Sequence, residues 1–382
     1  MRKTKLLALL LLLLSVALFT TGCWNRKELD KLGIVSAIGI DKEEDGKVKL
    51  TVQIIKPMPA KKGGGGGEKE KPVIILSSTG ETVFDAVRNF VEKSGRKLFH
   101  PHNSVIVLGE KMAREGVLPV IDWFNRDHEV RPLAWVMVTK GEASDIILTK
   151  SELERIPGHQ IEMMLQGYGG VSKTVPVHLL EFYEKLTSES DHPVLGRIQV
   201  KEEIDKTSTF ELKGAGVFRK DKLIGWLDPL ETRGYLWIRD KVKSGIITVT
   251  CPENENKLVS LEIIKAGSKI KPELKEGKIR YRIEVKVKSN IGENMCNEKL
   301  AKPEIIALLE EEQRAAVEQE IKTLVKQAQE KFKVDILGLG VATMRQYPEE
   351  WKELKDRWEE KFPQVEVEVE VTSKISLIGM VE

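Results

Sequence analysis

Cysteine and surplus charge are both scarce in this sequence. Only three of the 382 residues are cysteine, at positions 23, 251 and 296, which is too few for a fold held together by a disulfide scaffold. Basic and acidic residues nearly cancel, with 61 Lys and Arg against 59 Asp and Glu. A nucleic-acid-binding protein needs a basic excess to displace the counterions of phosphate groups. We therefore predict no nucleic-acid partner.

Enzyme motifs are missing as well. The sequence lacks Gly-x-Ser-x-Gly, His-Glu-x-x-His, Cys-x-x-Cys and the dinucleotide-binding fingerprint. A glycine run at 63–67 ends in Glu68, whereas a phosphate-binding loop ends in Gly-Lys-Ser/Thr, so we predict a flexible loop over 60–71. Ser94 and Lys97 fit Ser-x-x-Lys without its companion boxes, and Ser94 is better explained as the end of a helix. We predict no catalytic residue, no cofactor and a protein that is not an enzyme.

Histidine offers little for a metal site. His100 and His102 flank Pro101, and His128 follows further on. No carboxylate or thiol stands at a matching ligand spacing nearby. We therefore predict no metal, and expect partly buried histidines at the entry of a strand.

No long apolar run occurs near the N-terminus, but a short one does. Basic residues at positions 2, 3 and 5 precede residues 6–19, which are apolar apart from Ser15. A run of about 14 residues is short for a membrane-spanning helix, which needs about 20, and has the length of a signal-peptide core. Residues 1–22 are therefore predicted to be a cleaved signal peptide.

A cysteine follows the apolar run after a short segment of small residues. Thr20-Thr21-Gly22-Cys23 resembles the bacterial lipobox, although Thr20 replaces the usual aliphatic residue. We predict cleavage between Gly22 and Cys23 and lipidation of Cys23 by fatty-acyl chains such as palmitate. Two acyl chains hold a protein stably on a bilayer, whereas one holds it marginally. The alternatives are a secreted protein with an incidental cysteine and an uncleaved short anchor.

The residues after the cleavage site carry little net charge. Removal of the three basic residues of the signal leaves 58 Lys and Arg against 59 Asp and Glu, so attraction to anionic lipid is weak and attachment depends on Cys23 and on protein partners. Trp24 stands next to the predicted lipid. It either lies at the membrane interface, which indole favours, or belongs to a linker and packs against nothing.

Many segments, spread over both halves of the chain, resemble a single protein family. Those in the N-terminal half are Cys23-Trp24-Asn25-Arg26-Lys27-Glu28-Leu29-Asp30, Gly33-Ile34-Val35-Ser36-Ala37-Ile38-Gly39-Ile40-Asp41, Arg96-Lys97-Leu98-Phe99, His102-Asn103, Asp127-His128-Glu129-Val130-Arg131 and Ser172-Lys173-Thr174-Val175-Pro176-Val177. Those in the C-terminal half are Gly225-Trp226-Leu227, Glu231-Thr232-Arg233-Gly234-Tyr235-Leu236, Ser244-Gly245-Ile246-Ile247 and Tyr347-Pro348 with Trp351. Over essentially its whole length after Cys23, the chain resembles the Ger(x)C family, the lipoprotein C subunits of spore germinant receptors.

The resemblance implies a function and a place in the cell. A C subunit would be a lipid-anchored, non-enzymatic part of a receptor on the outer surface of the spore inner membrane. It would act beside integral-membrane A and B subunits in germination triggered by small nutrients. The family resemblance also implies a mixed α/β protein of three domains. The rival interpretation is a substrate-binding lipoprotein that captures the nutrient directly, although such proteins usually have two similar lobes.

The pattern after the signal predicts an α/β region over 23–205, with two subdomains as one option. Strands are expected at 33–41, 47–55, 73–76, 105–108 and 133–138, the first two as a hairpin. Ser78 and Glu81 read as a capping box that opens a helix ending at Gly95. Further helices are expected at 110–125 with a break near Pro119, around 161–165, and over 177–186 behind Pro176. Strands that alternate with helices indicate an α/β arrangement.

A second region, over 206–382, is predicted to be an α+β domain built from an antiparallel sheet and a long helix. A hairpin is expected at 211–227, strands at 246–250, 258–264, 279–287 and 365–371, and helices from Pro303 to Phe332 and from Pro348. The last strand alternates Val with Glu. Its Glu row either meets Arg282, Lys286 and Lys288 of a neighbouring strand or forms a solvated face, and we prefer the solvated face.

Two further features of this region concern its core. Cys251 and Cys296 either form a disulfide or are two small buried hydrophobic residues, and the sequence does not decide between them. Four tryptophans in apolar periodic runs are predicted to lie in the core, namely Trp226, Trp237, Trp351 and Trp358.

Overall fold

The computed structural model describes residues 2–8, 28, 31–56, 72–275, 278–296 and 302–377. Residues 2–8 are helical. Gly22, Cys23 and Trp24 lie outside the described residues, as does the loop predicted at 60–71. In the part of the chain that the structure describes, no helix is both long enough and apolar enough to cross a membrane.

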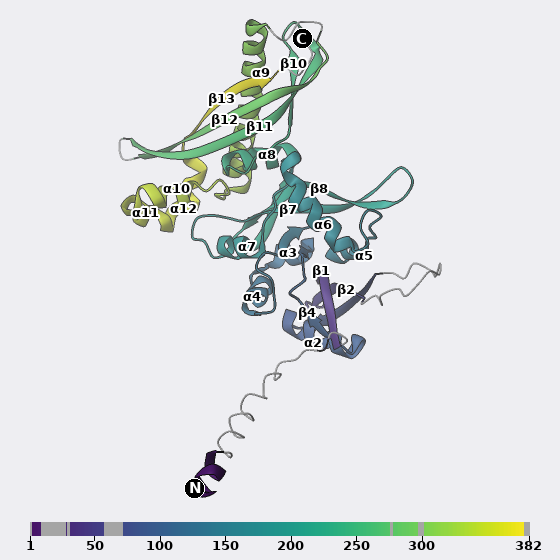
Figure 1. The fold of residues 1–382 in the computed structure, drawn as a ribbon. Helices are drawn as coiled ribbons and strands as arrows, with labels where there is room; N and C mark the ends of the chain where they lie inside the picture. Colours follow the sequence, from purple (N-terminus) through teal and green to yellow (C-terminus); the bar gives the residue numbers. More distant parts are fainter. Residues whose placement is uncertain are drawn as a thin grey trace.

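Two β-sheets organise the molecule, and helices pack on each (Figure 1). The first sheet has the strand order β3-β2-β1-β5-β6-β7-β8-β9, with β4 paired to β1. Its strands are β1 (Leu32–Lys42), β2 (Val48–Ile55), β3 (Val73–Gly80), β4 (Lys97–Phe99), β5 (Val105–Leu108), β6 (Trp135–Val138), β7 (Val194–Glu202), β8 (Ser208–Arg219) and β9 (Lys222–Leu227). The antiparallel hairpin predicted at 33–41 and 47–55 is confirmed as β1 and β2.

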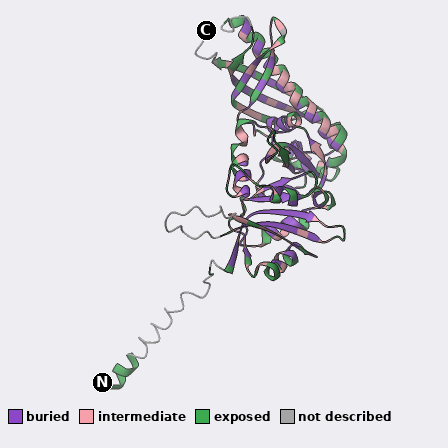
Figure 2. Ribbon diagram, turned by 90° about the vertical axis from the view of Figure 1, so that its right-hand side faces the viewer, coloured by how far each residue is buried: buried purple, intermediate pink, exposed green. Residues whose placement is uncertain are grey.

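Helices cover both faces of the first sheet. They are α2 (Val83–Ser94), α3 (Glu110–Glu115), α4 (Leu118–Arg126), α5 (Ala143–Leu148), α6 (Pro157–Gln166) and α7 (Leu179–Leu186). Along β5, Val105 and Val107 pack in one core cluster with α5 and α6, whereas Ile106 and Leu108 pack in the other with α2, α3, α4 and α7. A strand buried on both faces reads as a continuous apolar run, and Figure 2 shows how much of this sheet is buried.

The start of α2 differs from the prediction. Ser78 lies inside β3 rather than at a helix cap, because β3 stays paired with β2 as far as Gly80, opposite Val48. The cap is Thr82, whose hydroxyl accepts the N–H of Asp85 at 3.1 Å. The predicted capping box of Ser78 and Glu81 is therefore wrong. Gly95 ends the helix in a left-handed conformation, with φ of 62°, as predicted.

Two other helix boundaries have clear physical causes. The predicted break between 110 and 125 falls at Gly116 and Val117, and Pro119 then occupies the first turn of α4, where its missing N–H costs nothing. Pro176 does not open α7, contrary to the prediction. The carbonyl of Val177 accepts the N–H of Val136 beside β6, so the helix begins only at Leu179.

The second sheet has the order β10-β11-β12-β13 and forms one end of the molecule (Figure 1). Its strands are β10 (Ile246–Cys251), β11 (Asn254–Lys275), β12 (Lys278–Asn294) and β13 (Val367–Leu377). The long helix α9 (Pro303–Lys326) continues as a π-helix (Gln327–Phe332) and packs on this sheet. Shorter helices are α8 (Pro229–Ile238), α10 (Leu339–Gln346), α11 (Pro348–Leu354) and α12 (Trp358–Lys361). The predicted sheet and long helix are confirmed, except that β13 runs parallel to β12.

The predicted division at 205/206 falls in the turn between β7 and β8. These strands pair as an antiparallel hairpin, from Val194 opposite Val217 to Glu202 opposite Ser208. Residues 208–227 therefore continue the first sheet. The assignment of domains along the chain stays a prediction.

The row of alternating Glu residues at β13 lies beside β12. This is the arrangement required by the first of the two predicted alternatives, in which the row meets basic residues of a neighbouring strand. Glu366 pairs with Arg280 at 3.1 Å and Glu368 with Arg282 at 3.5 Å. Both carboxylates remain more than 60% exposed, so the row is solvated as well as paired. Lys286 and Lys288 do not meet it, because they stand opposite Thr372 and Lys374.

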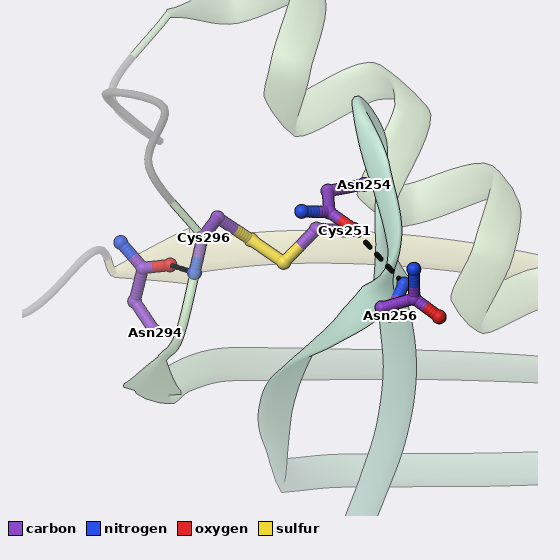
Figure 3. The surroundings of a disulfide bond; sticks show 5 residues. All are labelled: Cys251, Asn254, Asn256, Asn294 and Cys296. Carbon is purple, nitrogen blue, oxygen red and sulfur yellow. Dashed lines mark hydrogen bonds between the residues drawn. A yellow bond between two sulfur atoms is a disulfide. The ribbon is translucent and has the colours of Figure 1, made fainter.

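Cys251 and Cys296 form a disulfide that joins the end of β10 to the chain just after β12 (Figure 3). The side chain of Asn294 accepts the N–H of Cys296 at 2.7 Å, which fixes the turn next to the bond. Three of the four tryptophans predicted in the core are buried, namely Trp237, Trp351 and Trp358. Trp226 is only half-buried, because it lies on the last strand at that edge of the first sheet.

Candidate functional site at the start of the first sheet

The first described strand connects directly to the segment that contains the predicted lipid. β1 begins at Leu32, nine residues after Cys23, and nine extended residues span about 30 Å at most. The first residues of β1 pair with β4, so that Leu32 stands opposite Lys97 and Ile34 opposite Phe99. The surface around β4 is therefore within about 30 Å of the predicted anchor.

A pocket of about 350 Å³ opens between α2, β4 and α4. Its apolar wall consists of side chains from all three elements, namely Phe84, Val87, Val91, Leu98 and Trp123. The rings of Phe84 and Trp123 lie 6.4 Å apart, centroid to centroid. Phe84 is 49% exposed and Val91 is 45% exposed. Large apolar side chains left this open beside a cavity are typical of a surface that binds something.

His100 provides the buried polar group of this pocket. It follows β4 directly, is 2% exposed, and contacts the ring of Trp123 edge-on at 5.6 Å. Burial lowers the pKa of His100 to about 4, so the ring is neutral near pH 7. Its Nδ1 has no hydrogen-bond partner among the described residues. A buried nitrogen without a partner is costly, and a bound ligand could satisfy it.

Charged side chains line the rim of the pocket. Lys97 forms an ion pair with the buried Glu129 at 3.0 Å, and Arg126 forms one with Asp122 at 2.6 Å. Arg88 lies over the ring of Phe84, 4.8 Å from its centroid. No carboxylate of the described residues comes within ion-pair distance of Arg88. The pocket can thus accept a small molecule that has an apolar body and an anionic group.

The histidines considered for a metal do not converge. His128 has a side chain that is 90% exposed, and His102 is exposed while His100 is buried. Within the described ranges, no group of three or more His, Cys, Asp or Glu side chains could hold a metal ion. His100 and His102 precede β5, the strand predicted at 105–108, but His100 is fully buried and His102 is exposed, whereas the prediction was of partly buried histidines.

Two buried carboxylates could suggest chemistry but serve as helix caps and turn anchors. Burial raises the pKa of Asp41 and of Asp335 to about 6 each. Asp41 accepts the N–H groups of Ala143 and Ser144 at the start of α5. Asp335 accepts the N–H of Gly338 just before α10, the N–H of Gly340 in its first turn, and the indole N–H of Trp358. Their oxygens are therefore occupied by structural hydrogen bonds.

The segment Glu231–Leu236, which carries part of the family resemblance, joins the two halves of the fold. Arg233 donates to Glu320 of α9 and to the carbonyl of Ile246 at 2.8 Å. Gly234 lies so close to α9 that an added Cβ would stand 2.5 Å from the carbonyl oxygen of Glu320. Tyr235 accepts a hydrogen bond from the buried Lys185 of α7 at 3.0 Å. These residues fasten α8 to both sheets, and the segment is structural.

Sequence reasoning did not find the pocket, although one signal was present. Helix α2 carries Phe84 and Val91 as well as Val83 and Phe90. Val83 and Phe90 are buried, whereas Phe84 and Val91 are exposed. An apolar stripe wider than the core needs is the pattern expected when a helix also contacts a ligand or a partner.

Comparison with protein families divides the chain into two matched regions. Residues 25–200 match the model described as spore germination protein N-terminal domain, and residues 213–379 match the model described as spore germination B3/GerAC like, C-terminal. Spore germination protein KC of Bacillus subtilis is 29% identical, over 98% of this chain and 96% of that protein. Spore germination protein B3 of the same organism is 26% identical, over 94% and 95%.

Other similarities extend over most of the chain too. Spore germination protein GerQC of Bacillus cereus is 25% identical, over 97% of this chain and 99% of that protein. The crystal structure of the GerBC protein superimposes with a TM-score of 0.59 at 24% identity, covering 88% of this chain and 96% of that one. This likeness supports the mixed, multi-domain fold described above.

Proposed function

The chain belongs to the Ger(x)C family of spore germination proteins, and we propose that it is a lipid-anchored, non-enzymatic subunit of a nutrient germinant receptor. The observation that carries the proposal is the match to both family regions, in order, with relatives aligned over nearly their full length. The receptor role follows from the family, and the absence of a catalytic motif in the sequence supports the non-enzymatic assignment.

We further propose where the subunit resides and what it contacts. It is cleaved between Gly22 and Cys23, carries acyl chains on Cys23, and lies on the outer surface of the spore inner membrane with Trp24 at the interface. Integral-membrane A and B subunits are its partners. The support is the signal pattern and the short link between Cys23 and β1, which keeps the β4 surface within about 30 Å of the bilayer.

Cys23→Ser is expected to abolish acylation and to prevent stable retention of the protein on the membrane. The acyl chains contribute roughly 0.8 kcal/mol for each buried methylene, and little else in a nearly neutral chain attracts it to lipid. Metabolic labelling with an alkyne fatty acid, followed by membrane fractionation, measures both effects. Thr21→Ser is the matched control, because it alters the same segment and keeps the cysteine. Labelling that persists in Cys23→Ser refutes the anchor.

The same variant tests the receptor role in spores. Spores that carry Cys23→Ser in place of the natural chain should lose most of their response to one class of nutrient, as spores with a deletion should. Agents that bypass nutrient receptors should still trigger germination. An unchanged nutrient response in a strain without other receptors of this kind would contradict the proposed function.

A second candidate function is direct capture of the nutrient, and the pocket at β4 favours it. Phe84, Trp123 and the neutral His100 provide an apolar cavity with one buried polar atom, and Arg88 stands at its mouth. A small nutrient with an apolar body and a carboxylate fits this chemistry. The two functions are compatible in one receptor, but only the second requires the purified chain to bind nutrient by itself.

Calorimetry of the purified chain with candidate nutrients tests direct capture. We expect micromolar binding, weakened at least about tenfold in Phe84→Ala/Arg88→Gln, because both an aromatic contact and a charge-assisted hydrogen bond are lost. Leu133→Ala, which truncates another exposed apolar side chain outside the pocket, should bind as the natural chain does. Binding that is absent, or unaffected by the double change, removes the second candidate.

A further inference from the structure

The second sheet lies at the end of the molecule away from β1 and β4 (Figure 1). Lysines gather on its outer face. The strand register places Lys265 of β11 opposite Lys288 of β12, and Lys288 opposite Lys374 of β13. Three neighbouring strands thus carry lysine in one transverse row. Lys286 lies on the same face one row further along, between Gly267 and Thr372.

This row is unfavourable for the sheet by itself. Directly opposed side chains on neighbouring strands have Cβ atoms only about 5 Å apart, and like charges there are destabilising. Lys374 is relieved by Glu310 of α9, 2.9 Å away. No carboxylate of the described residues lies within ion-pair distance of Lys265, Lys286 or Lys288. An arrangement of this kind is neutralised most simply by a bound anion.

A groove of about 640 Å³ runs over this face. Gly267 forms part of its floor, and a Cβ placed on Gly267 would meet nothing closer than Asp240 Oδ1 at 4.0 Å. The groove is therefore open between the lysines. Six lysines line it in all, from three strands: Lys265, Lys269, Lys271, Lys286, Lys288 and Lys374.

The acidic groups that face the groove are already engaged. Glu284 pairs with Lys271 at 2.5 Å, and these lysine contacts lower the pKa of Glu284. Asp240 accepts the backbone N–H of Ser268 at 2.8 Å. Glu310 is held by Lys374 and by the N–H of Ile375. The groove therefore keeps a cationic surplus, which the nearly neutral composition of the whole chain conceals.

The cations of the groove are compatible with phosphate as the bound anion. Every cation that lines the groove is a lysine, and the arginines of β12, Arg280 and Arg282, lie further along and pair with Glu366 and Glu368. Arginine recognises both carboxylate and phosphate through its bidentate fork, and lysine binds phosphate as a point charge. Rows of lysine about 7 Å apart along a strand match a ligand with more than one phosphate.

We propose that this groove is a binding site for a ligand that carries two or more adjacent phosphate groups. Lys265, Lys286 and Lys288 contact the phosphate oxygens, and Gly267 leaves room for the ligand between them. The same chemistry is offered by a soluble polyphosphorylated molecule and by the phosphates of neighbouring anionic lipids in a membrane. The site is distinct from the pocket at β4 and does not depend on the proposed receptor role.

Calorimetric titration of tripolyphosphate into the detergent-solubilised full-length chain at low salt tests the site. We expect a micromolar dissociation constant that weakens as salt is added, because the contacts are exposed and screened. Lys286→Gln/Lys288→Gln should weaken binding at least about tenfold, since two charge-assisted contacts are lost. Lys288→Arg should retain binding. The double variant should unfold at the same temperature as the natural chain or a higher one, because a like-charge pair has been removed.

A charge-matched control separates a site from general attraction. Lys150→Gln/Lys213→Gln removes two exposed lysines elsewhere and should bind tripolyphosphate normally. Phosphatidylglycerol added to the micelles should displace tripolyphosphate if lipid head groups are the natural ligand, and failure to displace it identifies a soluble phosphate ligand. Absent binding, or equal weakening in the two double variants, overturns the proposal.

Discussion

Glu320→Ala is expected to destabilise the folded protein by roughly 3–5 kcal/mol, because it leaves a charge buried without a partner. Arg233 of α8 is 4% exposed, and its guanidinium donates two hydrogen bonds to the Glu320 carboxylate. Trp237 donates its indole N–H to the same carboxylate at 3.0 Å. Removal of Glu320 therefore leaves both donors unsatisfied at once. Urea denaturation followed by tryptophan fluorescence measures the change.

A surface pair on the same helix provides the control. Glu311 pairs with Arg314 on the exposed side of α9, and exposed pairs contribute little, so Glu311→Ala should leave the unfolding midpoint unchanged. Arg233→Met/Glu320→Leu should be less destabilised than Glu320→Ala, because no unpaired charge remains. If Glu320→Ala and Glu311→Ala unfold alike, the buried pair does not hold the two halves of the fold together.

The role of the segment Glu231–Leu236 depends on contacts with residues that are distant in the sequence. Arg233 and Gly234 belong to a segment whose resemblance to the family is visible in the sequence. Their structural role depends on Glu320, which lies far along the chain on another helix. Gly234 is required by the close approach of α8 to α9 and not by a turn, since an added Cβ would meet the Glu320 carbonyl oxygen. No local pattern predicts such a crossing.

The periodicity of apolar residues predicted the strands and helices well where an element has one buried face and one solvent-exposed face. In β12, Tyr281, Ile283, Val285 and Val287 are buried and alternate with half-buried or exposed polar residues, as the period of two predicts. The helix expected from Pro303 to Phe332 has an apolar stripe of helical period, and its five residues are buried, namely Val317, Ile321, Leu324, Ala328 and Phe332.

Long-range pairing accounts for what was missed. β3 runs on to Gly80 because β2 is present to pair with it, which displaced the predicted cap of α2. β8 and β9 continue the first sheet because β7 pairs with β8 across a charged turn that looked like a boundary. The pocket at β4 needs Phe84, His100 and Trp123 to meet from three separate elements. The two helices were expected, whereas β4 was not, and the convergence of the three elements is tertiary.

Replacement of Cys251 and Cys296 by alanine is expected to lower the stability of the second sheet by about 4 kcal/mol. The two cysteines are 45 residues apart in sequence, and closing a loop of that length in the unfolded chain removes conformational entropy worth about 4 kcal/mol. The closed loop contains the whole β11–β12 hairpin, so the bond ties the end of β10 to the end of β12 across the strand between them. The predicted export of the chain favours the oxidised state.

Reductant separates the contribution of the bond from that of the buried sulfur atoms. In the natural chain, dithiothreitol should lower the urea midpoint to about that of Cys251→Ala/Cys296→Ala. The double variant should not respond to dithiothreitol, because it has no bond to reduce. Thiol titration of the unreduced, denatured Cys23→Ser chain should find no free thiol. Two free thiols, or a natural chain whose midpoint ignores reductant, would mean that Cys251 and Cys296 are merely two small buried hydrophobic residues, the alternative that the sequence left open.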